Sequence, residues 1–235
     1  MNTMRFWIRD RKGSVILAGR NVSLLRTLAH LFPLGLLITG LFPPHAAAHS
    51  LEELEEKLKG RERYAQIVNY PAPEFRLRGL DGEAASLADL RGKVVVLWFV
   101  YTRCPDVCPL HSEALALIQE QVNQTPMREL VQFITITTDP EHDTLKVLQD
   151  YGPKHGLDPI NWTVLTSGPE EPSATREIAE KFGLKFTLGE DGYQMHGVVT
   201  HLIDKSGNLR ARYHGLRFHP TNLIVHINAL SNDYH

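Results

Sequence analysis

The chain contains the stretch Trp98-Phe-Val-Tyr-Thr-Arg-Cys104-Pro-Asp-Val-Cys108-Pro-Leu-His-Ser-Glu-Ala-Leu115, which holds its only two cysteines. The apolar run Val94–Val100 leads into this stretch and predicts a buried strand. The apolar residues between Leu115 and Val122 follow it with roughly helical spacing. We therefore expect the cysteines where a strand ends and a helix begins. A helix N-terminus carries unpaired N–H groups and a partial positive charge, which favour a thiolate over a thiol.

The spacing of Cys104 and Cys108 leaves three uses open. On a regular helix their Cβ atoms would lie about 5–6 Å apart. A disulfide needs about 3.8 Å, so a bridge would require a distorted first turn. Two unbridged sulfurs on one face can instead bind one soft metal ion, Cu(I) or Zn. A purely structural pair is the third possibility, but we expect both cysteines at an exposed helix mouth, which favours chemistry.

The length and composition predict one domain of ordinary size with an N-terminal extension. The chain has 235 residues, of which 43% are hydrophobic, enough for a sizeable core. Six of the 25 Lys and Arg residues, but only one of the 27 Asp and Glu residues, precede residue 49. The remainder carries 19 basic and 26 acidic residues, a formal charge of −7. This charge argues against nucleic acid as a partner.

The N-terminal residues 1–48 have the pattern of an export signal. A basic segment precedes the apolar stretch Leu28–Phe42, and small residues follow in His45-Ala-Ala-Ala-His49. We expect a signal peptide or an uncleaved membrane anchor, with translation from a later start as a further alternative. Each version exports the domain, to the bacterial periplasm or the periplasmic face of the inner membrane. Cysteines in an oxidising compartment normally form a disulfide, so a reduced working state would need an outside reductant.

The rest of the chain predicts alternating strands and helices. We expect an amphipathic linker helix at Leu51–Lys59 within residues 49–70, followed by one domain over residues 71–235. Asp143 is a candidate cap for the helix that runs towards Tyr151. The other expected elements are a hairpin around Asp81-Gly82, strands at Leu130–Thr137 and Trp162–Leu165, a helix from Ser173 or Thr175 to Phe182, a turn between Leu188 and Tyr193, a hairpin of Val198–Ile203 with Leu209–Tyr213, and a helix at Pro220–Leu230.

This order, βαβ, αβα, then a hairpin and a closing helix, predicts a three-layer α/β sandwich with a mixed central sheet. Sites in such sheets lie beyond the carboxyl end of a strand, at a helix N-terminus. The cysteine stretch is expected at that place.

Among twelve histidines, His196 is the strongest candidate for a third ligand. It directly precedes the predicted strand Gly197–Ile203, and in a thioredoxin-like sheet that entry lies against the mouth of the cysteine helix. A Cys₂His set suits Cu(I) and can also hold Cu(II). The other histidines are weaker candidates or carry no expected role: His111 one turn after Cys108, His214 and His219 near a loop, His201 facing solvent or a covering helix, and His142, His155, His226 and His235 without assignment.

Three motifs resemble those of the Sco/SenC family. Tyr101-Thr-Arg-Cys-Pro-Asp-Val-Cys-Pro109 is similar to its YT-x-C-P-D-x-C-P signature. Thr137-Thr-Asp-Pro-Glu-His-Asp-Thr144 resembles S-x-D-P-x-x-D-T, and His196-Gly-Val-Val-Thr-His-Leu-Ile-Asp204 resembles H-x-x-x-x-x-L-I-D. The match covers roughly Pro71 to Leu230, in the family's order.

The resemblance implies a thioredoxin-like fold that binds copper through Cys104, Cys108 and His196. It implies delivery of copper to cytochrome c oxidase, or reduction of the cysteines of its copper-bearing subunit, with another copper chaperone and a thiol reductant as further partners. Family members often carry Asp before the ligand histidine, where this chain has Met195. Met195 would itself offer a soft thioether to Cu(I).

Two enzymatic alternatives remain beside a copper chaperone. In the first, a thiol–disulfide oxidoreductase, Cys104 and Cys108 would be a redox-active pair. Thioredoxin-like oxidoreductases use two intervening residues and a proline before the strand that here begins at Gly197, and this chain has neither. The second is a peroxidase of the peroxiredoxin type, which Thr102-Arg-Cys104 faintly resembles. That mechanism leaves Cys108 and His196 without a role.

Overall fold

The computed structural model describes residues 50–188 and 194–233, with side chains for these residues except 188 and 194–196. The expected signal or anchor at residues 1–48 lies outside the described residues. The helices are α1 (Leu51–Arg61), α2 (Val107–Asn123), α3 (Leu145–Lys154), α4 (Ala174–Lys181) and α5 (Pro220–Asn232), with 3₁₀ turns η1 (Ala88–Leu90) and η2 (Pro126–Glu129). The strands are β1 (Ala65–Pro71), β2 (Arg76–Arg78), β3 (Ala84–Ser86), β4 (Val94–Val100), β5 (Val131–Thr137), β6 (Trp162–Leu165), β7 (Phe186–Leu188), β8 (Gln194–His196), β9 (Val199–Ile203) and β10 (Asn208–His214).

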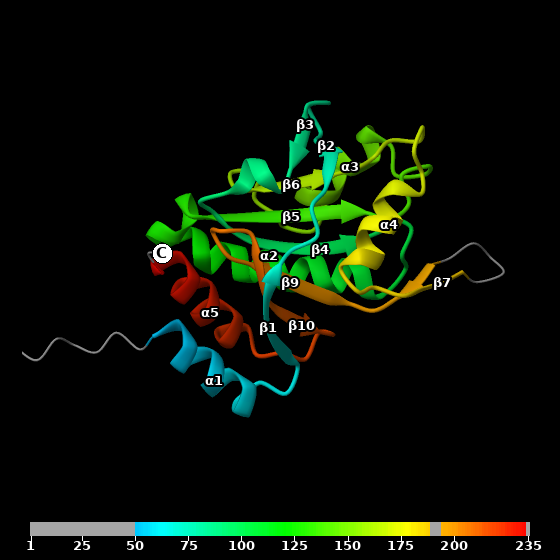
Figure 1. Ribbon diagram of the computed structural model, residues 1–235. Coiled ribbons are helices and arrows are strands. Elements are labelled where there is room, and N and C mark those ends of the chain that lie inside the picture. Colours follow the sequence, from blue (N-terminus) through cyan, green and yellow to red (C-terminus); the bar gives the residue numbers. More distant parts are fainter. Residues whose placement is uncertain (1–49, 189–193, 234–235) are drawn as a thin grey trace, which may run out of the picture. The chain divides into compact units, whose positions relative to one another are not determined.

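The central sheet is mixed and has the strand order β1-β10-β9-β4-β5-β6. β4 pairs in parallel with β5, and β5 with β6, whereas β9 and β10 run antiparallel to their neighbours. Every residue of β4 is buried, as expected for a strand covered on both faces. Figure 1 shows β4 and β5 in the middle of the sheet, with α2 packed behind them.

Two apolar clusters lie on opposite faces of this sheet. Alternate residues of β4, such as Val96 and Trp98, join α1, α2, α3 and α5 in one cluster. The intervening residues, such as Leu97 and Phe99, join β2 and α4 in the other. The period-two alternation of a strand thus serves both layers, and the expected three-layer sandwich with a mixed sheet is confirmed.

Helix α1 is fixed to the domain by buried polar contacts. Ser50 caps it by accepting a hydrogen bond from the Glu53 amide at 3.2 Å. The buried carboxylate of Glu55 accepts from Arg210 Nη2 at 2.9 Å and lies 3.2 Å from His226 Nε2. The sequence predicts the helix at Leu51–Lys59, which is confirmed as α1, but it predicts no strand at Ala65–Pro71. Instead β1 is an edge strand of the sheet, paired with β10.

The start of α1 and the end of α5 lie beside the amino end of β4. Ser50 and Asp233 line the same hollow. Near the end of α5, the carbonyl of Ser231 accepts a hydrogen bond from Lys205 Nζ at 2.8 Å. The carbonyl of Lys205 in turn accepts from the Gly92 amide, two residues before β4, at 2.9 Å.

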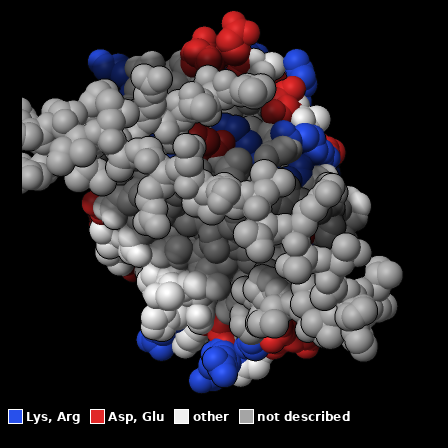
Figure 2. Space-filling view, turned by 90° about the vertical axis from the view of Figure 1, so that its left-hand side faces the viewer, with Lys and Arg blue, Asp and Glu red and all other residues white. Residues whose placement is uncertain are grey.

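Charged side chains of both signs are mixed on the surface. In Figure 2, Lys and Arg lie beside Asp and Glu around the margin of the face, outside the part drawn in grey. Within the described residues, no helix is both long and apolar enough to cross a membrane.

Two helical glycines provide a stability test with opposite signs. A Cβ on Gly152 in α3 would lie 2.2 Å from the ring of Trp162, whose Nε1 is held by Thr135 Oγ1 at 2.9 Å. We expect Gly152→Ala to lower the free energy of unfolding by about 1–3 kcal/mol through overpacking. Gly60 in α1 has open space around it, so Gly60→Ala should raise stability by about 0.5–1 kcal/mol. Urea unfolding of both variants checks this, and shifts of the same sign would contradict it.

Candidate metal centre

The two cysteines lie at the carboxyl end of β4, as the sequence predicts. Cys104 is in the loop between β4 and α2, and Cys108 is the second residue of α2. The expected exposed helix mouth is wrong, because Cys104 is 8% exposed and Cys108 3% exposed. Both sulfurs pack into the apolar cluster on the α2 face of the sheet, together with Tyr101 and Leu115. Since Cys104 precedes the helix, the spacing of a regular helix does not apply to the pair.

The pair is unbridged, and its two sulfurs differ in charge. Both are free cysteines, and the Cys108 amide donates to Cys104 Sγ at 3.4 Å. The Cys108 thiol also donates to Cys104, and together with backbone donors from Asp106 and Cys108 this lowers the pKa of Cys104 to about 5, against the opposing effect of burial. The same hydrogen bond and burial raise the pKa of Cys108 well above that of an ordinary thiol. At neutral pH the site therefore holds one thiolate and one thiol.

A series of hydrogen bonds between buried polar side chains leads to the backbone of Cys108. Trp98 Nε1 donates to Ser112 Oγ at 3.2 Å, and Ser112 Oγ lies 2.8 Å from the hydroxyl of Tyr151. That hydroxyl donates to the carbonyl of Cys108 at 3.4 Å. Through these bonds, strand β4 and helix α3 are linked to the first turns of α2.

The loop that follows β5 lies against the cysteine loop. Arg103 forms an ion pair with Asp139, Nη2 to Oδ2 at 2.8 Å, and Asp139 Oδ1 also lies 2.8 Å from His142 Nδ1. The expectation that Asp143 caps α3 is wrong, because Thr144 is the N-cap and accepts from the Val147 amide. Asp143 turns inward instead and bonds to Thr102.

His196 ends the short strand β8, opposite Phe186 of β7. Its side chain lies outside the described residues, so its predicted ligand role stays a prediction. Residues 50–187 and 197–233 contain no group of three His, Cys, Asp or Glu side chains arranged to hold a metal.

Two of the other candidate histidines, His111 and His201, have structural partners. His111 is buried, and its Nε2 lies 2.7 Å from Thr200 Oγ1, so it joins α2 to β9. His201 is also buried and lies 3.2 Å from the carbonyl of Phe182 at the end of α4. Of the two alternatives predicted for His201, solvent or a covering helix, the structure therefore shows the helix. Burial lowers the pKa of His201 to about 3 and keeps it neutral.

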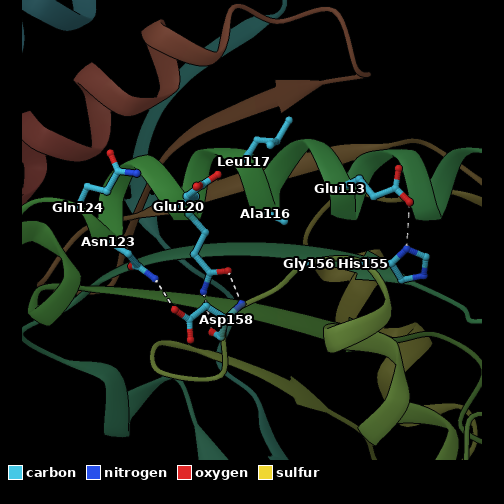
Figure 3. A pocket seen from close by; sticks show the side chains of 10 residues that line it. Glu113, Ala116, Leu117, Glu120, Asn123, Gln124, His155, Gly156 and Asp158 are labelled. Carbon is cyan, nitrogen blue, oxygen red and sulfur yellow. Dashed lines mark hydrogen bonds and ion pairs between the residues drawn. The ribbon is translucent and has the colours of Figure 1, made fainter.

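A groove of about 600 Å³ lies along the later turns of α2. Neither Cys104 nor Cys108 lines it. Figure 3 shows Leu117 and Glu120 on one wall and His155 and Asp158 on the other. Gln119 bonds across it to the Asp158 backbone at 2.9 Å. The groove contains neither sulfur and is not the site of thiol chemistry.

Comparison with known proteins decides the family. The model of the SCO1/SenC family matches residues 66–232. The chain belongs to the SCO1/SenC family. The human mitochondrial SCO2 homolog is 32% identical over 162 residues, 64% of this chain and 58% of that protein. The SCO1 homolog of Bacillus subtilis is 27% identical over 169 residues, 71% of this chain and 85% of that protein. The match thus spans little more than half of the human relative.

Solved Sco structures share the fold of this SCO1/SenC protein. A SCO1/SenC family lipoprotein from Bacillus anthracis superposes with a TM-score of 0.63 at 26% identity, covering 71% of this chain and 98% of that one. BsSco, described as a member of the Sco family of cytochrome c oxidase assembly proteins, gives 0.63 at 24% identity over 72% of this chain and 98% of its own. Copper-bound yeast Sco1 gives a TM-score of 0.59 at 22% identity, covering 70% of this chain and 90% of that one. The last two show the fold alone, and the thioredoxin-like class is confirmed.

The charge difference between the sulfurs can be measured directly. In the reduced, metal-free protein, thiolate absorbance should reveal one sulfur titrating with a midpoint near pH 5. Cys104→Ala should abolish this step. Cys108→Ala should move it upward, because the thiolate loses its thiol donor. A wild-type midpoint above that of a free thiol, about 8.5, would contradict the assignment.

Proposed function

We propose that this protein is a copper metallochaperone that binds one copper ion through Cys104, Cys108 and His196. The supporting observation is the unbridged pair of sulfurs, one of them ionised, at the carboxyl end of β4. Thiolates are the ligands that select Cu(I), and the remaining position suits an imidazole. Membership of the SCO1/SenC family and the likeness to copper-bound yeast Sco1 support the same cargo.

The two sulfurs have different tasks in uptake. Cys104 offers a ready thiolate, held by the Cys108 amide and thiol. Cys108 must lose its proton to solvent before it can ligate, so copper binding releases a proton. Copper affinity should therefore fall as the pH is lowered. Burial of both sulfurs limits access by competing thiols.

We propose that the recipient is the copper-bearing subunit of cytochrome c oxidase, either loaded with copper or reduced at its cysteines. The family name and the assembly role stated for BsSco support this recipient. We further propose that residues 1–48 are a signal peptide or membrane anchor that precedes the copper domain, and that the domain works in the periplasm. The basic and apolar N-terminal pattern supports export, as does the likeness to a lipoprotein.

The second candidate function is a thiol–disulfide oxidoreductase. One observation favours it: a thiolate beside a protonated thiol is the arrangement needed to attack a disulfide and then resolve it. The three residues between Cys104 and Cys108, and the presence of His196, favour the metal site instead.

Copper titration of the reduced protein tests the ligand set. Wild type should bind one copper ion against a Cu(I)-selective chelator. Cys104→Ala and Cys108→Ala should each abolish tight binding, because one thiolate cannot hold Cu(I) against competing thiols. Unchanged affinity in both variants would refute the copper site.

His196→Ala separates the two candidate functions. Loss of a ligand should lower copper affinity by at least the roughly 10–100-fold typical of losing an outer-shell partner. The rate of insulin reduction should be low in wild type and change little in the variant, because dithiol exchange needs no imidazole ligand. Wild-type copper affinity with full oxidase activity in cells carrying His196→Ala would favour the oxidoreductase.

A further inference from the structure

Asp143 lies where the loops after β4 and β5 meet. Its side chain is buried, with the residue 1% exposed. The carboxylate accepts hydrogen bonds from the Thr102 amide, at 3.1 Å to Oδ2 and 3.3 Å to Oδ1. It also accepts from the hydroxyls of Thr102 and Thr137. One carboxylate therefore joins the end of β5 to the second residue of the cysteine loop.

The contact with Thr102 bears on the sulfurs through a short piece of backbone. Thr102 stands two residues before Cys104, and the Cys104 amide donates to the Tyr101 carbonyl at 3.1 Å. The loop must place the amides of Asp106 and Cys108 towards Cys104 Sγ, because these donors help to ionise it. The Arg103–Asp139 ion pair also joins the two loops, but Arg103 is 40% exposed and such pairs contribute little. Asp143 joins the two loops through a buried side chain.

Joining two loops through a buried carboxylate costs free energy, because the charged group loses its contact with water. Burial raises the pKa of Asp143, against the lowering effect of the hydrogen bonds from Thr102 and Thr137. Apolar side chains of similar volume often stabilise a fold as well as buried charges do. The carboxylate also lies near enough to Cys108 to contribute to its raised pKa. The position suggests a role in the site as well as in the fold.

We propose that Asp143 is a positioning residue of the cysteine site, whose carboxylate holds the Thr102 peptide and so keeps the two sulfurs in the unbridged arrangement that takes up copper. The link to copper rests on the proposed function. The effect on the sulfurs themselves does not, since it concerns the metal-free, reduced protein.

Asp143→Asn tests the proposal with two measurements. Mass spectrometry after brief alkylation of the metal-free protein gives the ratio of Cys104 to Cys108 labelling. We expect wild type to label mainly at Cys104 and the variant to lose roughly tenfold in this ratio, the equivalent of one strong hydrogen bond. Copper affinity, from competition with a Cu(I)-selective chelator, should fall by roughly 10–100-fold.

Asp204→Asn is the matched control. Asp204 is also a partly buried carboxylate that holds loop amides, those of Ser206 at 3.0 Å and Asn208 at 2.8 Å, in the turn between β9 and β10. Its contacts do not include the cysteine loop. We expect it to lower stability without changing the labelling ratio or the copper affinity.

Thr102→Val keeps the test decisive if Asp143→Asn fails to fold. It removes one hydroxyl donor to Asp143 and leaves the Thr102 amide in place. A smaller change in the same direction would support the proposal. A labelling ratio equal to that of Asp204→Asn would overturn it. If wild type binds no copper, the proposed function fails, and the labelling ratio alone still decides the role of Asp143.

Discussion

The parallel pairing of β4 with β5 determines where everything else in the site lies. Their register joins Val100 to Thr137, so both strands end at the same edge of the sheet. The residues that follow the two strands therefore lie close together. The Thr138 amide, for example, donates a hydrogen bond to the Val100 carbonyl at 2.8 Å. Two loops that are more than thirty residues apart in sequence are thereby built as one structure. The cysteine loop cannot shift without disturbing the loop that carries Asp139 and Asp143.

This arrangement explains how a buried site can be charged. Cys104 Sγ receives donors from its own loop and from the first turn of α2, so the negative charge is met by hydrogen bonds in place of water. Asp143 adds a carboxylate close by, and the negative charges of Cys104 and Asp143 help to keep Cys108 protonated. A cation entering here finds one charge already available and a second that becomes available when a proton leaves. The negative charge of the site thus favours a cation over a neutral ligand.

The fold was largely predictable because its signals are local. The seven apolar residues of β4, the boundaries of β6 and the Asp204–Asn208 turn all follow from composition and turn residues. Strand β1 was missed because an edge strand with mixed polarity has no strong period, and its strand character comes from pairing with β10. The role of Asp143 was missed for a related reason. Its sequence context allows a helix cap, and only the parallel register of β4 and β5 brings Thr102 within reach. The ligand set depended on family motifs, since spacing alone left metal, disulfide and structural uses open.

The position of helix α1 determines how far the first described residues lie from the sulfurs. Because Glu55 holds α1 against α5, the chain enters the domain beside the amino end of β4. The cysteines stand at the other end of that strand, whose seven residues span about 20 Å. Ser50 is thus separated from the sulfurs by about the length of this strand. The end of the domain that carries the sulfurs is therefore not the end at which α1 begins.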